Sequence, residues 1–361
     1  MNLRRLIDTT KIIKVNPIYP EESLIKEAAD IISKGGLVAF PTETVYGLGG
    51  DAFNRDAVIK IFKAKRRPID NPLIVHIASV KQLEELTEDL PQEALLIAQK
   101  LWPGPITILV KKSNKVLEEV SASLPTVAIR FPAHPIAIKL IEFCGKPIAA
   151  PSANLTGKPS PTTAKHVIDD LMGTIDMIID GDETLFGVES TIINLTSKPP
   201  TLLRPGPITP RDLEGVLGAR VEIPPSARGI VEAELALAPG MKYKHYAPKA
   251  RMIVVETGNY QNLTRIVSKI RSLALDNRKA KVGILCCKET FEFYRHVPAV
   301  KVSLGSRSNP YEVAKNLFAS LRRFDDEDVE IIFAEGYEEK GLGLTIMNRL
   351  RKASGFNIVK V

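Results

Sequence analysis

The sequence is poor in cysteine: its 361 residues include only Cys144, Cys286 and Cys287. This odd, sparse set has no paired spacing, which argues against a disulfide framework and a cysteine-rich zinc site. The scarcity favours a reducing compartment. No stretch approaches the roughly 18 apolar residues of a membrane span, and the first residues have no apolar core of signal-peptide length. We therefore expect a cytoplasmic protein with no membrane segment.

Several catalytic signatures are also missing. The sequence has no nucleophile elbow, no Walker-type lysine loop and no histidine cluster with metal-ligand spacing. A site in this chain would therefore act through positioning and positive charge, without a covalent intermediate or a protein-bound metal. The formal net charge of +7 favours anionic partners such as nucleotides, pyrophosphate or RNA, but only mildly.

Helix-like and strand-like segments alternate over the first two thirds of the chain, which predicts an α/β fold with a sheet partly covered by helices. The predicted strands are 37–40, 73–77, 106–110, 126–130, 147–150, 177–180, 191–195 and 201–204. The predicted helices are 21–34, 54–65, 92–101, 135–143 and 162–172. A chain of this length is expected to form two domains.

The pattern changes between about residues 215 and 249, where proline, glycine and small residues predict a linker. A second alternation follows and resembles a small doubly wound, Rossmann-like domain. Its predicted strands are 252–256, 282–286, 299–302 and 330–334, and its predicted helices are 260–274, 310–323 and 344–352. We predict a domain over 1–214, a linker over 215–249 and a second domain over 250–361.

Three segments offer polar groups next to predicted strands. Pro41–Gly49 provides threonine hydroxyls and glycine amides, and is equally consistent with a ligand-binding loop or an ordinary turn. Lys63–Pro68 places four cations at a helix end, where they bind phosphate or are simply solvated. Ala149–Gly157 places Ser152 and Asn154 at alternate positions, although a plain strand-to-turn junction also explains it.

Single residues add to this picture. Arg130 and Arg204 each end a predicted strand shortly before a proline, which favours a guanidinium directed into a cleft over one on the surface. His76 lies in an apolar strand, where a lone histidine is more often a core residue than a catalyst. Gly341-Leu342-Gly343-Leu344 is a weak candidate for a helix that begins over a phosphate.

Taken together, these stretches resemble the YrdC family over residues 15–210. The matching segments are 36–49, 65–68 with 71–73, 102–105, 150–154, 187–192 and 203–206. The segment 239–248 and the second domain resemble the longer, two-domain threonylcarbamoyl-AMP synthases, so the resemblance spans nearly the whole chain. It implies a YrdC-like twisted open sheet with helices, linked to a small Rossmann-like domain.

The resemblance also implies a reaction. L-threonine, bicarbonate and ATP, with Mg²⁺ bound through the ATP phosphates, would give threonylcarbamoyl-AMP and pyrophosphate. The product would pass to the tRNA threonylcarbamoyl transferase machinery, and weak binding of tRNA itself is compatible with the positive charge.

By the same resemblance, the predicted site residues fall into three groups. The paired catalytic motif would be Lys65, Arg67, Ser152 and Asn154. ATP would contact Arg67, Asn71, Thr126, Ser152, Ser160 and Arg204, together with Tyr243 or Tyr246 from the linker, between which the sequence does not choose. Threonine would be surrounded by Thr44, His76, Arg130, Ala150 and Ser190.

Two other readings remain open at the level of the sequence. A carbamoyl transferase of the hydrogenase-maturation type also contains a YrdC-like domain, but such proteins carry zinc-finger cysteine pairs that this chain lacks. An RNA-binding module without chemistry is permitted by the net charge. However, aromatic residues are only 6% and are not interleaved with the basic ones.

Overall fold

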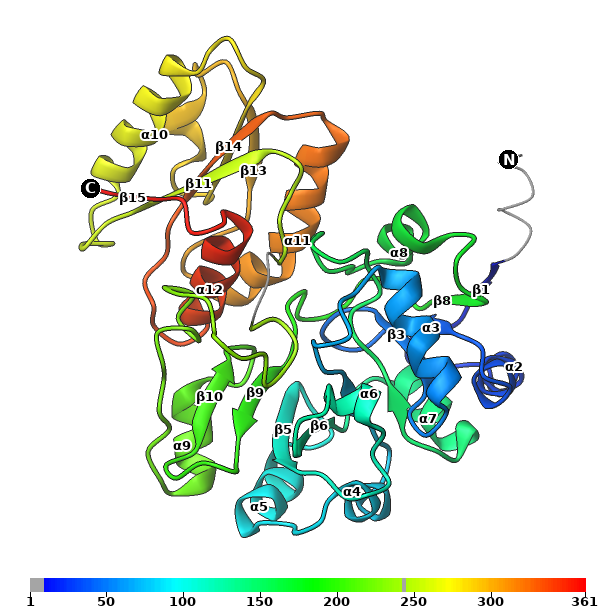
Figure 1. Ribbon diagram of the computed structural model, residues 1–361. Coiled ribbons are helices and arrows are strands. Elements are labelled where there is room, and N and C mark those ends of the chain that lie inside the picture. The colour runs from blue at the N-terminus through cyan, green and yellow to red at the C-terminus, as the bar shows by residue number, and fades with distance from the viewer. Residues whose placement is uncertain (1–9, 242–244) are drawn as a thin grey trace. The chain divides into compact units, whose positions relative to one another are not determined.

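The computed structural model describes residues 10–241 and 245–361, which fold into two compact units (Figure 1). Of the described residues, the first unit contains 10–156, 160–224 and 233–241. The second contains 157–159, 225–232 and 245–361. The predicted linker is therefore shared: of its described residues, 215–224 and 233–241 belong to the first unit, and 225–232 and 245–249 belong to the second.

A single mixed sheet forms the frame of the first unit. Among the described residues it has ten strands in the order β1-β8-β2-β3-β7-β4-β6-β5-β9-β10. Their bounds are β1 Lys11–Lys14, β2 Val38–Phe40, β3 Gly47–Asp51, β4 Ile74–His76, β5 Ile106–Lys111, β6 Thr126–Arg130, β7 Ile148–Ala149, β8 Met177–Asp180, β9 Thr191–Asn194 and β10 Thr201–Arg204. Neighbours in space are often distant in sequence, so the sheet brings separate motifs together.

Helices cover this sheet. They are α2 Glu22–Ser33, α3 Arg55–Lys65, α4 Val80–Leu86, α5 Gln92–Leu101, α6 Glu118–Ser121, α7 Pro135–Cys144, α8 Ala164–Leu171 and α9 Pro210–Leu217. Helices α2 and α7 pack with β2, β7 and β8 in one buried apolar cluster. Local sequence fixes several helix ends: Asn54 caps α3 and Gly145 ends α7 in a left-handed conformation.

Strand β3 is missing from the sequence-based prediction, which treats Pro41–Gly49 as a loop. The strand is missed because glycine is a poor strand former in isolation. The same glycines are explained by the close packing around the strand. A Cβ on Gly49 would lie 2.7 Å from Cε1 of Phe40 and 2.8 Å from Cγ2 of Ile148. Close packing therefore requires glycine here. Strand β1 and helices α4, α6 and α9 are also absent from the prediction.

The second unit is built on a fully parallel sheet. Its five described strands follow the order β13-β12-β14-β11-β15, with bounds β11 Arg251–Glu256, β12 Val282–Cys286, β13 Val300–Ser303, β14 Ile331–Glu335 and β15 Ile358–Lys360. Helices α10 Thr264–Asp276, α11 Pro310–Asp326 and α12 Gly343–Ala353 and a short 3₁₀ turn, η1 Phe291–Tyr294, connect them. This architecture confirms the predicted Rossmann-like domain and, with the first sheet, the α/β class.

No helix within residues 10–241 and 245–361 is long and apolar enough to cross a membrane.

Candidate active site

Three polar side chains lie side by side across the centre of the first sheet. Strand β6 pairs with β4 and β5 so that Arg130 is the register partner of both His76 and Thr107. Side chains at paired positions share one face of a sheet. Thr126 lies on the same face, because it is four residues before Arg130 on one strand. The sheet therefore gathers these residues on a single surface, which we call the polar face.

The guanidinium of Arg130 on this face meets a carboxylate from the loop after β2. Nη2 of Arg130 lies 2.8 Å from Oε2 of Glu43, and both side chains are only 5% exposed. The contact is close in distance, but its angles do not make a hydrogen bond. The backbone of Glu43 is fixed, since its carbonyl accepts from Phe186 N at 2.9 Å. Glu43 is not among the site residues predicted from the sequence, although an acidic residue in such an otherwise uncharged motif is a signal for it.

The predicted threonine-binding residue Thr44 follows directly in the same loop. Its hydroxyl lies 2.9 Å from that of Thr42, which in turn donates to the carbonyl of Val45 at 2.7 Å. Thr42 also accepts from the backbone N of Thr44 at 3.1 Å. These local hydrogen bonds fix the conformation of the loop. They therefore also fix the position of the buried hydroxyl of Thr44, the residue that follows Glu43.

The loop between β8 and β9 and the end of β10 supply another pair of predicted residues. Arg204 donates from Nε and Nη2 to the carbonyl of Ser190 at 3.1 and 2.9 Å, and from Nη2 to its hydroxyl at 3.1 Å. The hydroxyl of Ser190 is also 2.8 Å from that of Thr107. Ser190 is thus connected to the polar face through Thr107, a residue that the sequence analysis did not name.

Gly206 makes this arrangement possible. A Cβ at this position would lie 2.2 Å from the backbone N of Thr191 and 2.6 Å from the carbonyl carbon of Ser190. Both contacts are to backbone, so a side chain would have to separate the two loops.

Lys65 and the Ser152–Asn154 segment are in direct contact. Lys65 ends α3 and is 1% exposed, and its Nζ donates to the carbonyl oxygens of both Ser152 and Asn154. The hydroxyl of Ser152 donates to Oδ1 of Asn154 at 2.6 Å. Lys65 is therefore no solvated helix end. Lys65 thus forms one cluster with Ser152 and Asn154, which follow it in the chain by 87 and 89 positions.

Arg67 organises the segment that leads into β4. Its Nε donates to the carbonyl of Asn71 at 3.1 Å and its Nη2 to that of Pro72 at 2.9 Å. The turn between Lys65 and Arg67 requires Arg66 in a left-handed conformation, with φ of 51°. This turn places Arg67 on the buried side, while Arg66 is exposed.

The remaining predicted residues of the first unit lie nearby in the fold. Ser160 donates to Oε1 of Glu189 at 2.5 Å, one residue before Ser190 in the chain. Ala150 donates its backbone N–H to the carbonyl of Ile74 at 2.9 Å, which ties the end of β7 to β4. Both predicted residues are therefore anchored to elements that carry the polar face.

Buried polar atoms without a hydrogen-bond partner concentrate around the polar face. Such atoms are rare in proteins because each one costs free energy, and they often face a ligand. Among the residues that the structure describes, most of them belong to five side chains of this site: Glu43, Asn71, His76, Thr126 and Arg130. Four of the five are residues that the sequence analysis had selected.

Two histidines near Glu43 and Arg130 are neutral. Burial, together with the positive charge of Arg130, lowers the pKa of His76 to about 3. Burial also lowers the pKa of His134 to about 4, although the charge of Glu43 opposes this shift. At physiological pH both imidazoles are therefore uncharged hydrogen-bonding groups.

The linker segment 233–241 packs on the polar face itself. Its residues Ala238 and Met241 share an apolar cluster with Ile74, Leu109 and Ala128. These three sheet residues are two positions from His76, Thr107 and Arg130 on their strands, so they lie on the same face. The carbonyl of Pro239 also accepts from Nη1 of Arg204 at 3.2 Å.

Of the two candidate linker tyrosines, Tyr243 and Tyr246, the structure describes only the second. Tyr243 lies outside the described residues. Tyr246 belongs to the second unit, where its ring stacks on Phe318 with a centroid separation of 5.1 Å, and Cζ of Arg349 lies 5.2 Å from the Tyr246 centroid.

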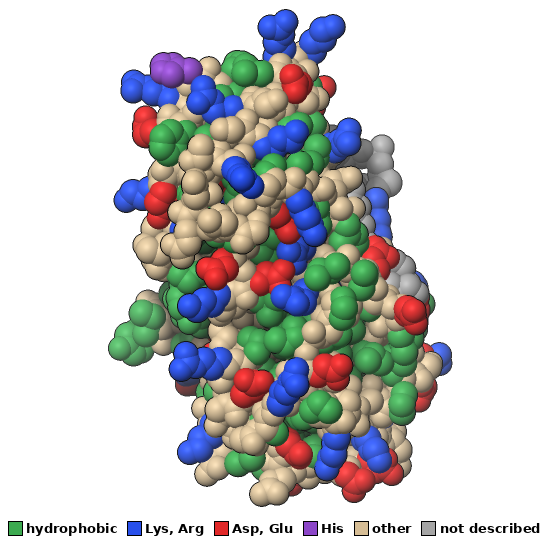
Figure 2. Space-filling model, turned by 90° about the vertical axis from the view of Figure 1, so that its left-hand side faces the viewer, with side chains coloured by type: hydrophobic (Ala, Val, Ile, Leu, Met, Phe, Trp, Pro, Cys, Tyr) green, Lys and Arg blue, Asp and Glu red, His purple; other side chains and the backbone are tan. Residues whose placement is uncertain are grey.

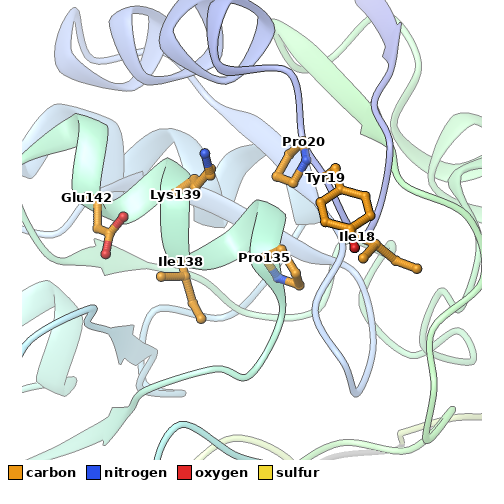
Figure 3. A pocket seen from close by; sticks show the side chains of 7 residues that line it. All are labelled: Ile18, Tyr19, Pro20, Pro135, Ile138, Lys139 and Glu142. Atoms are coloured by element: carbon orange, nitrogen blue, oxygen red, sulfur yellow. The ribbon is translucent and has the colours of Figure 1, made fainter.

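A separate groove of about 470 Å³ lies on the surface of the first unit. Figure 3 shows Ile18, Tyr19 and Pro20, before α2, near Pro135 and Ile138 of α7. No predicted site residue lines it, so it is distinct from the polar face. Within the described residues, no group of three or more His, Cys, Asp or Glu side chains is arranged to hold a metal ion.

Comparisons with known proteins agree with this organisation. A model of the family described as "Telomere recombination" (Sua5/YciO/YrdC) matches residues 30–206. A model of the "Threonylcarbamoyl-AMP synthase, C-terminal domain" matches residues 208–355. The two folds and the polar face thus define a two-domain protein whose first domain is of the YrdC type.

Relatives over nearly the full length make the assignment more specific. Threonylcarbamoyl-AMP synthase from Pyrococcus abyssi is 50% identical, over 94% of this chain and 97% of its own length. The Bacillus subtilis enzyme of the same name is 43% identical, over 99% of both chains. The crystal structure of P. abyssi Sua5 complexed with L-threonine matches with a TM-score of 0.90 and 49% identity, covering 98% of this chain and 100% of that one. The chain belongs to the threonylcarbamoyl-AMP synthase family.

Proposed function

We propose that this chain is an L-threonylcarbamoyladenylate synthase, which converts L-threonine, bicarbonate and ATP to threonylcarbamoyl-AMP and pyrophosphate. Family membership over nearly the whole length supports this function. Its main structural support is the concentration of buried, unpartnered polar atoms in Thr126, His76 and Arg130 on one face of the first sheet, and in Glu43 and Asn71 from loops next to its strands. Such a surface suits a small, highly polar substrate that supplies the missing hydrogen bonds.

The chemistry proceeds in two stages. The amine of threonine first becomes a carbamate by reaction with bicarbonate. One carbamate oxygen then attacks the α-phosphorus of ATP, and pyrophosphate leaves. Negative charge grows on the phosphate oxygens in this second stage, so fixed cations nearby lower its barrier. Lys65, Arg67 and Arg204 are the cations that we assign to this role, and Mg²⁺ would enter as part of the ATP substrate.

Lys65 is well placed to act with the backbone around it. Its Nζ holds the carbonyls of Ser152 and Asn154, so the loop and the ammonium form one rigid unit. A rigid cation needs little reorganisation as charge develops, and this is the main advantage of a preorganised site. We assign Asn71, Thr126, Ser152 and Ser160 to contacts with ATP, and Asn154 to the paired catalytic motif with Lys65, Arg67 and Ser152.

Threonine would bind on the polar face, around Arg130. The planar fork of Arg130 suits a carboxylate, and neutral His76, Thr44 and Ser190 offer groups for the amine and hydroxyl beside Ala150. Alanine and valine would leave such polar groups unpaired, which predicts strong rejection of both.

The linker has a role in this proposal because the carbamate is unstable in water. Segment 233–241 covers part of the polar face and is bonded to Arg204 through Pro239. A lid of this kind excludes solvent while the intermediate forms. The contact of Tyr243 or Tyr246 with the nucleotide stays a prediction.

The test is a pyrophosphate-release assay on the purified full-length chain. Release should require threonine, bicarbonate and Mg²⁺-ATP together, and mass spectrometry should detect threonylcarbamoyl-AMP. ATP turnover that is independent of threonine or bicarbonate would refute the proposed function. The product would be consumed in the cytoplasm by the tRNA threonylcarbamoyl transferase machinery.

A further inference from the structure

Glu43 has no role in the reaction described so far, yet it is a buried carboxylate that lies against Arg130 of the polar face. Both of its carboxylate oxygens are buried and lack a hydrogen-bond partner in the described structure. Its nearest opposite charge is Arg130, whose Nη2 lies 2.8 Å from Oε2 without the angles of a hydrogen bond. A buried carboxylate in this condition is costly unless a bound ligand completes its environment.

The pair of opposite charges has a shape that matches one class of ligand. An α-amino acid carries its ammonium and its carboxylate on the same carbon, so its two charges are also adjacent. A guanidinium and a carboxylate side by side present the complementary arrangement, with the guanidinium facing the ligand carboxylate and Glu43 facing the ligand ammonium. Arg130 alone would recognise any carboxylate, whereas the pair requires an amino acid.

We propose that Glu43 binds the α-ammonium group of threonine and accepts the proton that must leave before the amine can react. The inference rests on the proposed function, because it concerns the first stage of that reaction. It adds a catalytic residue to the residues that the sequence suggested.

The proton and electron balance of this step is simple. The ammonium gives one proton to a carboxylate oxygen of Glu43, so an N–H bond breaks and an O–H bond forms. The free amine then attacks the carbon of bicarbonate, and a C–N bond replaces a C–O bond. The departing hydroxide takes the second amine proton and leaves as water. The carbamate remains, and Glu43 later releases its proton to solvent.

The neighbours of Glu43 do not compete for this task. His76 and His134 have pKa values lowered by burial and are already neutral, so they carry no charge for the ammonium to meet. In the described structure, Glu43 is the acidic side chain within ion-pair distance of Arg130. Glu189, farther along the chain, already accepts a hydrogen bond from Ser160.

The decisive experiment compares two ligands on the full chain by calorimetry. 3-Hydroxybutanoate has the carbon chain, hydroxyl and carboxylate of threonine but no ammonium. The wild-type protein should bind threonine about 10- to 100-fold more tightly than this analogue, which is the usual value of a charged hydrogen bond. Glu43→Gln keeps the shape but not the charge, so this preference should disappear. A Glu43→Gln protein that keeps the preference would overturn the inference.

Turnover provides the second measurement. Glu43→Gln should lose threonine-dependent pyrophosphate release, and Glu43→Asp, which retains a carboxylate, should recover part of it with a larger loss in kcat than in KM. Normal turnover of Glu43→Gln would also overturn the proposal. The matched control is Glu27→Gln, an exposed acid paired with Lys11 on the surface, which should behave as wild type.

Folding must be separated from binding, since Glu43→Gln leaves Arg130 without its neighbour. Circular dichroism and thermal melting test this directly. If the single variant is unfolded, the Glu43→Gln/Arg130→Gln double variant removes both charges and should bind neither ligand preferentially; a threonine preference in it would refute the role of Glu43. Failure of the proposed function would appear differently, as a wild-type protein without threonine-dependent turnover.

Discussion

Lys65 shows how one side chain serves both the fold and the proposed chemistry. It is buried at the end of α3, and its ammonium bridges two carbonyl oxygens of the Ser152–Asn154 segment. The dipoles of the two carbonyl groups hold the ammonium of Lys65 in place. The ammonium therefore lies against the Ser152–Asn154 segment, whose Ser152 we assign to ATP. An ion held this way is costly to remove, because the two carbonyls then lose a buried donor.

We expect Lys65→Ala to lower both activity and stability. Loss of a fixed charge in such a site costs about 2–4 kcal/mol in the barrier, and the unpaired carbonyls cost about 1–3 kcal/mol in the free energy of unfolding. Pyrophosphate release and urea denaturation measure the two effects. Lys63→Ala is the matched control, since Lys63 is exposed on the same turn of α3. Normal turnover of Lys65→Ala would remove Lys65 from the site.

His76 leads to a prediction for the pH dependence of stability. Its folded-state pKa, about 3, is lower than the ordinary value of 6.5 in the unfolded chain. The unfolded state therefore gains a proton first as the pH falls, and stability is complete above pH 6.5 and declines below it. Each such histidine contributes a slope of up to about 1.4 kcal/mol per pH unit. His134 adds to it, with a pKa of about 4.

Urea denaturation between pH 7 and pH 5 measures this slope. We expect His76→Gln to reduce the slope of the free energy of unfolding against pH, whatever its effect at pH 7. A slope that is unchanged in this variant would show that His76 titrates normally in the folded protein.

At the scale of elements, the most consequential feature is the linker segment 233–241. It lacks helix and strand, yet it contributes buried apolar residues to the cluster on the polar face. It is held by this apolar contact and by the bond from Arg204 to Pro239. Ala236 and residues 238–241 of this segment are buried, so a lid role in the proposed function depends on this packing.

We predict that Ala238→Glu releases this segment. Ala238 is fully buried in the cluster, and a carboxylate there would be desolvated without a partner. Turnover should fall strongly, and limited proteolysis should cut the segment faster, while the sheet keeps its thermal stability. Leu235→Glu is the matched control, because Leu235 in the same segment is 56% exposed. Full activity of Ala238→Glu would contradict a role for segment 233–241 as a lid.

At the scale of the whole molecule, the formal net charge of +7 is a modest excess of positive charge. On the face drawn in Figure 2, Lys and Arg side chains are interspersed with Asp and Glu. A modest net charge of this size favours weak, sequence-independent attraction to polyanions.

We therefore expect tRNA to bind weakly and with strong salt dependence. Non-specific affinities of this kind lie at about 10⁻⁴–10⁻⁶ M, and about three phosphate contacts imply a loss of roughly 40-fold between about 50 and 200 mM salt. Filter binding or fluorescence anisotropy at several salt concentrations measures this dependence. Tight binding that is insensitive to salt would instead indicate a specific tRNA site.

The sequence by itself determined the α/β class and most elements. The predicted strand Thr126–Arg130 has the observed bounds, because alternation and the flanking prolines are local signals. It also selected residues of one face, since Arg130, Thr126 and His76 each stand on or at the end of a buried strand. Strand β3 escaped prediction because its glycines are explained only by the side chains of Phe40 and Ile148 that pack against them.

Tertiary structure alone decided which residues meet. The contacts of Lys65 with residues 87 and 89 positions away, and of Arg130 with Glu43, arise from the order of strands in the sheet, which no local pattern encodes. The same holds for segment 233–241, whose small apolar residues have no periodicity and become a cover only through contact with β4, β5 and β6. Local sequence sets the conformation of each segment, whereas the energetics of burial set its partners.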